Sequence, residues 1–170
     1  MEVTWVPFEL HPETPEEGIL LSERLGREEF RMSLENLRKR GQRWNMEYAG
    51  MKRMSNSHLA LLAGLYATRK QTVEAFSTAV NHAYFEEGLN IGRLEVLLDI
   101  GEKSGLDRQA FQNYLQEAGD ELLMPAKKLI EKWTVDSVPT FVVADLYKIV
   151  GSDQEQILRN AIESVMKQSE

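Results

Sequence analysis

The sequence predicts an α/β protein in which a short strand, a long helical block, a β-hairpin and a final helix follow one another. Three observations predict this order: apolar alternation at residues 2–10, helical hydrophobic spacing over residues 30–133, and two runs of β-forming residues after residue 140. The 170 residues are enough for a domain that buries about two-thirds of its unfolded surface. We therefore expect one domain over residues 1–170.

The first element is a predicted strand at residues 2–10, where Val3, Trp5 and Pro7 alternate with other residues. A loop at residues 11–18 follows, because two prolines stand there among acidic side chains. Residues 44–48 fit either a short extended piece or a loop with anchoring side chains.

Six helices are predicted from apolar residues at helical spacing. Gly41, Gly88 and Gly105 follow three of them as C-terminal caps, Asp107 caps the fifth, and Pro125 marks a break in the sixth. Their apolar stripes lie at residues 30–37, 59–66, 73–83, 94–98, 111–115 and 122–133.

The last part of the chain contains a predicted hairpin and helix. Residues 141–143 and 148–150 are β-formers, and the residues between them suit a tight turn. The final helix is predicted to start at Ser152, whose hydroxyl would form a capping box with Glu155.

Composition excludes several classes of protein. Hydrophobic residues make up 42% of the chain and charged residues 28%, as in ordinary globular proteins. The net charge is −7, and the one basic cluster, residues 38–43, falls at a predicted helix end, so we expect no nucleic-acid partner. The longest apolar stretch is about half of what a bilayer crossing needs, and no signal-peptide pattern is present. We expect a cytoplasmic protein with no membrane partner.

The chain contains no cysteine. Disulfides, thiolate zinc sites, iron–sulfur clusters and dithiol-disulfide exchange by these residues alone are therefore excluded. The histidines His11, His58 and His82 show no spacing typical of metal ligands, so we expect no metal. No serine lies in a nucleophile-elbow pattern, and no catalytic residue is assigned.

Several segments resemble DsbA-like thioredoxin-fold proteins. Residues 138–143, Val-Pro-Thr-Phe-Val-Val, closely resemble the cis-proline loop of that family. Residues 5–10 resemble its second strand, residues 83–92 its helical insertion, and Asn56 with Ser57 fits another signature. These matches follow the expected order along most of the chain. They point to the cytoplasmic FrnE-like branch of dithiol-disulfide oxidoreductases and isomerases.

The resemblance implies a division of the chain. Residues 1–18 and 134–170 would form the thioredoxin-type part, and residues 19–133 a mostly helical insertion. Relatives begin with a strand, a Cys-x-x-Cys turn and a helix, ahead of the segment matched by residues 2–10. That module has no counterpart in this sequence, so the expected fold is a DsbA-like sheet without its first β-α unit.

The missing strand would be central, between the strand at residues 2–10 and the strand at residues 141–143. Without it two strand edges are open, and a buried backbone group left unpaired costs about 1 to 3 kcal/mol. Three solutions remain: a rearranged sheet, a second copy of the chain, or an N-terminal fragment outside this sequence. We expect rearrangement or a homodimer, or a partner chain that completes the sheet.

The resemblance also implies a binding site at Val138, Pro139 and Thr140. A proline that opens a strand removes one ladder donor and can adopt the cis form. An extended peptide or a glutathione-like ligand would lie along this backbone. The family's activity would be disulfide exchange or isomerisation, but this chain is expected to be redox-inactive.

A second branch of the same fold comprises kappa-class glutathione transferases and 2-hydroxychromene-2-carboxylate isomerases, which use serine. Residues 151–153, Gly-Ser-Asp, resemble their Gly-x-Asp glutathione-binding turn. This resemblance implies that Ser152, Asp153 and Asn56 contact a ligand. We expect no cofactor, apart from the glutathione that this resemblance implies.

Structural roles compete with these functional ones. Ser152 caps the last helix in the simpler interpretation, and Ser55, Asn56 and Ser57 are typical N-cap residues of the helix that follows. A third hypothesis is therefore a non-catalytic, dimeric binding or regulatory protein.

Overall fold

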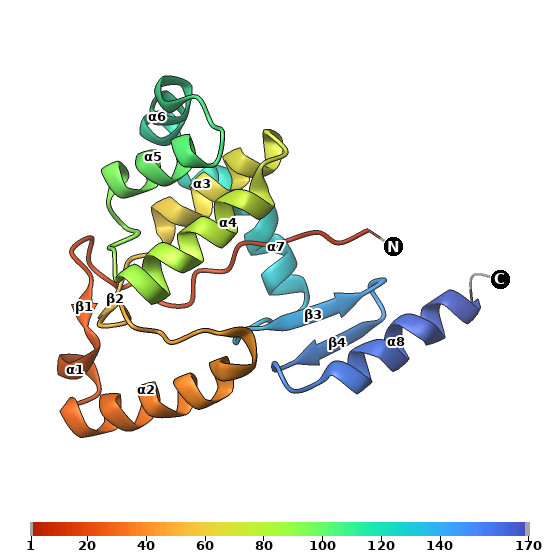
Figure 1. Ribbon diagram of the computed structural model, residues 1–170. Helices are drawn as coiled ribbons and strands as arrows, with labels where there is room; N and C mark the ends of the chain where they lie inside the picture. Colours follow the sequence, from red (N-terminus) through yellow and green to blue (C-terminus); the bar gives the residue numbers. More distant parts are fainter. Residues whose placement is uncertain (1, 169–170) are drawn as a thin grey trace. The chain divides into compact units, whose positions relative to one another are not determined.

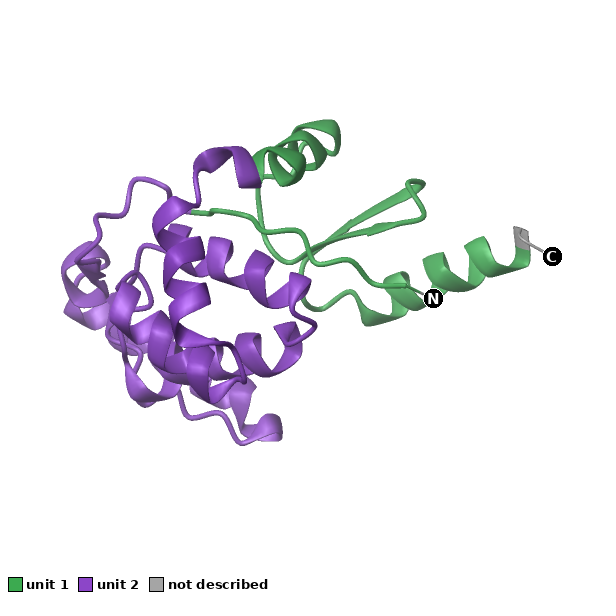
Figure 2. Ribbon diagram, turned by 90° about the horizontal axis from the view of Figure 1, so that it is seen from above, with its two compact units in different colours: residues 1–10, 123–170 green, residues 11–122 purple. Residues whose placement is uncertain are grey.

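The computed structural model describes residues 2–168. The chain separates into two compact units, which Figure 2 shows in different colours: residues 1–10 with 123–170 form unit 1, and residues 11–122 form unit 2. The sequence predicted boundaries near residues 18 and 134 instead. The loop at residues 11–18 belongs to unit 2 because side chains of that unit hold its backbone. A single domain over residues 1–170 stays a prediction.

Unit 2 is mostly helical (Figure 1). The spacing of apolar residues predicted its longer helices correctly, whereas the two-residue strands show no alternation and were not predicted. In chain order its elements are β1 (Ile19–Leu20), α1 (Leu21–Arg24), α2 (Arg27–Gly41), η1 (Gln42–Trp44), β2 (Arg53–Met54), α3 (His58–Arg69), α4 (Val73–His82), η2 (Ala83–Glu87), α5 (Leu94–Lys103), α6 (Arg108–Glu117) and η3 (Asp120–Leu123).

The core of unit 2 lies between α3, α4, α5 and α6. Leu62, Phe76, Leu97 and Phe111 are at most 1% exposed, and the rings of Phe76 and Phe111 meet edge to face at 5.9 Å. Burial of such side chains contributes about 1.5 to 3 kcal/mol each. The apolar stripes therefore act together as one core, which holds these four helices in place.

Helix ends in unit 2 follow the expected chemistry at two places. The Asp107 carboxylate accepts a hydrogen bond from the Ala110 N–H (2.8 Å) and caps α6, as predicted. Gly88 ends the π-helical turn η2 in the left-handed region, with a φ of 72°. Gly41 differs from the prediction, because it is the last residue of α2 and has no left-handed conformation.

Unit 1 contains α7 (Met124–Lys132), β3 (Thr140–Val143), β4 (Tyr147–Val150) and α8 (Glu155–Gln168). β3 and β4 form the predicted antiparallel hairpin, in which Phe141 faces Ile149 (Figure 1). Ala144 and Asp145 both have positive φ angles, 50° and 55°, as a tight hairpin turn requires. The predicted break before α7 is present, since η3 ends where α7 begins and Pro125 lies in its first turn.

The strand predicted at residues 2–10 is wrong. No regular element forms there, and Val3 and Trp5 are 65% and 79% exposed. Apolar alternation makes a segment suitable for a strand, but a strand exists only when a second one pairs with it. Within residues 2–168 the structure contains two sheets of two strands each, β1–β2 and β3–β4, which agrees with the expected incomplete sheet.

Candidate functional site

The predicted binding loop lies directly before β3. Val138 and Pro139 are joined by a cis peptide bond, and Thr140 is the first residue of the strand. The Thr140 hydroxyl donates a hydrogen bond to the Ser137 carbonyl (2.7 Å), which fixes the loop locally. The Val138 side chain is 52% exposed. The loop therefore presents an apolar side chain and its own backbone to solvent.

The turn after β4 is bonded to this loop. The Gly151 N–H donates to the Pro139 carbonyl (2.9 Å), and Ser152 and Asp153 follow with exposed side chains. Gly151 has a φ of 104°, which side chains of other residues rarely allow. Five of the six predicted binding residues thus belong to one end of the hairpin: Val138, Pro139, Thr140, Ser152 and Asp153.

The last helix begins three residues later than the predicted start at Ser152. The positive φ of Gly151 and the turn after it delay the helix, so the Leu158 N–H bonds to the Gln154 carbonyl (2.9 Å) and α8 begins at Glu155. Glu155 is the first helical residue, whereas a capping box needs it to be the third.

Hydrogen bonding within the hairpin leaves the outer edge of β3 open. In an antiparallel ladder, facing pairs that exchange hydrogen bonds alternate with pairs that do not. Because Pro139 is bonded to Gly151, the next bonded pair toward the turn is Phe141 with Ile149. No strand among the described residues pairs with the other side of β3. Within β3, the residues whose N–H and C=O groups point away from β4 are Thr140 and Val142.

The sixth predicted residue, Asn56, lies in unit 2 and has a structural role there. Its side-chain oxygen accepts a hydrogen bond from the His58 N–H (2.9 Å) at the start of α3. Its side-chain nitrogen donates to the Thr14 carbonyl (2.6 Å). Ser57 occupies the N-cap position but forms no side-chain cap bond. Asn56, and not its serine neighbours, therefore satisfies an amide at this helix end.

Sequence reasoning missed how firmly the loop at residues 11–18 is held. Besides Asn56, the Arg53 guanidinium donates to the Glu17 carbonyl (2.7 Å) and the Asn90 amide donates to the Glu16 carbonyl (2.9 Å). These donors lie 36 and 74 residues along the chain from their acceptors. No local pattern signals such contacts.

In unit 2, burial changes the pKa of the Tyr84 hydroxyl. Tyr84 follows α4, and burial raises the pKa of its hydroxyl, while a hydrogen bond with the Ser55 backbone acts in the opposite direction. The hydroxyl is therefore protonated at neutral pH. The Ser55 hydroxyl itself is buried and has no hydrogen-bond partner among the described residues.

The end of α7 braces the hairpin turn. The Trp133 ring N–H donates to one Asp145 carboxylate oxygen (3.3 Å), and the Lys132 ammonium lies 3.0 Å from the other. The hydrogen bond from Lys132 and its charge hold the pKa of Asp145 below its ordinary value. The Lys148 ammonium, on β4, donates to the Thr134 carbonyl (2.6 Å). These contacts position the β3–β4 hairpin against the segment that leads into the loop.

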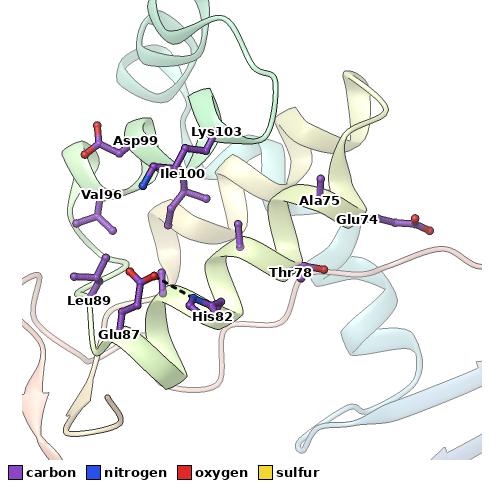
Figure 3. Close-up of a pocket in the computed structure, with 12 residues that line it drawn as sticks. Glu74, Ala75, Thr78, His82, Glu87, Leu89, Val96, Asp99, Ile100 and Lys103 are labelled. Carbon is purple, nitrogen blue, oxygen red and sulfur yellow. Dashed lines mark ion pairs between the residues drawn. The ribbon is translucent and has the colours of Figure 1, made fainter. Parts of the chain in front are cut away.

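A cavity of about 770 Å³ lies in unit 2 between α4, η2 and α5 (Figure 3). The side chains of His82 and Glu87, which line it, point toward one another, with 3.1 Å between His82 Nδ1 and the carboxylate. Its wall includes Ala79, Val96 and Ile100, and none of the predicted binding residues. Within residues 2–168, no three His, Asp or Glu side chains gather as metal ligands do. No described helix has the length and hydropathy to cross a membrane.

Comparison with known proteins agrees with a thioredoxin-type fold that carries a helical insertion. Residues 1–163 match the DSBA-like thioredoxin domain family, and the chain belongs to this family. The uncharacterized protein YwbO of Bacillus subtilis is 25% identical over 170 residues, which cover 98% of this chain and 84% of YwbO.

Two of the solved structures that are similar to this chain are an oxidoreductase and an isomerase. A probable DsbA oxidoreductase from Streptomyces coelicolor has a TM-score of 0.84 at 17% identity, and the match covers 95% of this chain and 74% of that protein. A 2-hydroxychromene-2-carboxylate isomerase has a TM-score of 0.60 at 25% identity, with 84% of this chain and 71% of the isomerase covered. The first likeness shows the fold alone.

Proposed function

We propose that these 170 residues form a thiol-free binding member of the DsbA-like family, which holds an extended peptide along the outer edge of β3. The observation that supports the proposal is the set of outward backbone groups at Thr140 and Val142. A peptide that adds to such an edge gains main-chain hydrogen bonds, while neighbouring side chains select its sequence.

The side chains beside this edge favour an apolar peptide. Residues 138–143 carry no charge, and Val138, Phe141 and Val142 are 52%, 37% and 39% exposed. Charged residues in the bound peptide would lose hydration without gaining an opposite charge from these side chains. We therefore expect preference for uncharged, β-branched or aromatic segments.

Disulfide chemistry by this chain alone is excluded in the proposal, because the sequence contains no cysteine. In an insulin-reduction assay with dithiothreitol, the purified chain should give the rate of buffer alone. A rate clearly above that of buffer would overturn this part of the proposal.

Binding is tested by NMR titration of the ¹⁵N-labelled chain with an unstructured, apolar peptide. The amide signals of Thr140 and Val142 should shift most, because their N–H groups would bond to the peptide. The amides of Lys148 and Val150 on β4 act as an internal control on the opposite edge. Equal shifts on both edges, or none, would contradict the proposed site.

A second candidate function is glutathione-dependent transfer or isomerisation. The bond between Gly151 and Pro139 favours it, since it joins the loop to the turn that resembles a glutathione-binding sequence. The similarity to the isomerase is consistent with this candidate. Calorimetric titration with glutathione should give a saturable heat that Asp153→Asn weakens. Absence of heat at millimolar glutathione would remove this candidate.

The FrnE-like branch and the cytoplasmic location are also proposals, and they rest on the sequence resemblance. Cell fractionation with antibody detection tests the location, and recovery of the protein outside the cytoplasmic fraction would contradict it.

A further inference from the structure

The two outer edges of the β3–β4 hairpin differ in charge. On β4, the outward groups belong to Lys148 and Val150, and the lysine is a residue that natural edges use against strand addition. On β3, the outward positions are Thr140 and Val142, neither of which is charged. The β3 edge therefore lacks the protection that the β4 edge has.

Pro139 does not protect the β3 edge either. Its missing N–H lies on the side of β4, where its carbonyl still accepts the Gly151 N–H. The outward donors of β3 are the N–H groups of Thr140 and Val142, which proline does not replace. A proline guards an edge only when its missing donor points outward.

Unit 1 also contains most of the exposed large hydrophobic side chains. Of the eighteen large hydrophobic side chains exposed among the described residues, fourteen belong to unit 1. Phe141, Val142 and Val150 of the hairpin are among them, at 37%, 39% and 43% exposure. A hairpin of two strands is marginal by itself and is stabilised by further strands or by a packed helix. Here α8 contacts both β3 and β4, and the hairpin still has an open β3 edge.

We propose that the outer edge of β3 pairs with β3 of a second copy of this chain, antiparallel and about a two-fold axis. This inference rests on the proposed function, because the same edge would hold the peptide. Uncharged residues 138–143 would face their own counterparts, so no pair of like charges opposes the contact. A two-fold contact requires a self-complementary surface, and a neutral strand edge is one. The product is a four-stranded sheet in the order β4, β3, β3 of the second copy and β4 of the second copy.

The second copy and a peptide would then compete for one edge. The dimer is the resting form, and peptide binding releases monomers. Apparent peptide affinity therefore falls as the chain concentration rises, by the law of mass action.

Two matched proline variants test the dimer. Val142→Pro removes an outward N–H of β3, and Val150→Pro removes an outward N–H of β4, while both leave the bonds between the two strands in place. Sedimentation velocity should give twice the mass of the chain for the unchanged protein and for Val150→Pro, but a monomer for Val142→Pro. Circular dichroism establishes that both variants are folded. Val142→Lys is a second route to the same monomer if the proline variant unfolds.

Other outcomes decide against the inference. A monomeric unchanged protein at high micromolar concentration overturns it, and so does a dimer that survives both Val142→Pro and Val142→Lys. The peptide titration is independent of these results. A monomer that binds peptide refutes the dimer alone, and a dimer whose β3 amides never respond to peptide refutes the proposed function alone.

Discussion

Gly151 donates its backbone N–H to the carbonyl oxygen of Pro139 at 2.9 Å, so the turn after β4 is tied to the loop before β3. Directly after this bond, the φ of 104° at Gly151 turns the chain from β4 into the segment that precedes α8. Two segments that are twelve residues apart in sequence thereby become one structural feature at the end of the hairpin.

Gly151→Ala should destabilise the chain by about 1 to 2 kcal/mol, because a Cβ disfavours this φ. Steric clash is a minor contribution, since the nearest atom to an added Cβ, Gln154 Cγ, is 3.8 Å away. Urea unfolding measures the change. A variant as stable as the unchanged chain would mean that the turn tolerates another conformation.

Asn56→Ala should cost about 1 to 3 kcal/mol, because it leaves the Thr14 carbonyl and the His58 amide without their partner. Asn81→Ala is the matched control, as Asn81 is exposed on α4 and forms no such bond. Unfolding midpoints of the two variants give the comparison. If Asn56→Ala instead left stability unchanged and weakened ligand binding, a ligand role would replace the structural one.

Two helical glycines should respond in opposite directions to replacement by alanine. At Gly64, nothing lies within 4 Å of an added Cβ, so Gly64→Ala should stabilise α3 by about 0.5 to 1 kcal/mol. At Gly101, the Cβ would lie 2.5 Å from the Phe111 ring, so Gly101→Ala should destabilise by about 1 to 3 kcal/mol. Thermal unfolding of both variants checks the signs, and equal signs would contradict the packing of α5 against Phe111.

Asp145 should make stability depend on pH in the acid range. Its pKa is lowered in the folded chain by the Lys132 hydrogen bond and charge. The stabilisation is therefore complete above the ordinary value of 3.8 and is lost as the pH falls through the lower folded value. Asp145→Asn should flatten this part of the curve of unfolding midpoint against pH. Glu29→Gln, which alters an exposed carboxylate, is the control and should leave the curve unchanged.

Local patterns predicted much of this fold. Apolar residues at helical spacing predicted the longer helices, and the β-forming residues after residue 140 predicted β3 and β4. Both patterns can be recognised because they involve residues that are close in sequence. The strand expected at residues 2–10 was wrong because pairing is a property of two segments. The helix start at Glu155 was missed because the φ of Gly151 delays it.

The residues of the candidate site were predicted only in part. Resemblance identified the loop at Val138, Pro139 and Thr140 and the turn at Ser152 and Asp153, and the structure shows them at one end of the hairpin. It did not reveal that the Asn56 amide holds Thr14 across 42 residues. Side-chain bonds to distant backbone groups leave no periodic trace in the sequence.

Because Trp133 is hydrogen-bonded to Asp145 in the hairpin turn, its fluorescence can report on the position of the hairpin. Of the three tryptophans, Trp5 and Trp44 are 79% and 61% exposed, whereas Trp133 is half-buried and hydrogen-bonded to Asp145. Iodide will therefore quench the first two in the folded chain far more than the third. The emission that iodide spares reports whether the hairpin is docked on the end of α7, without any added label.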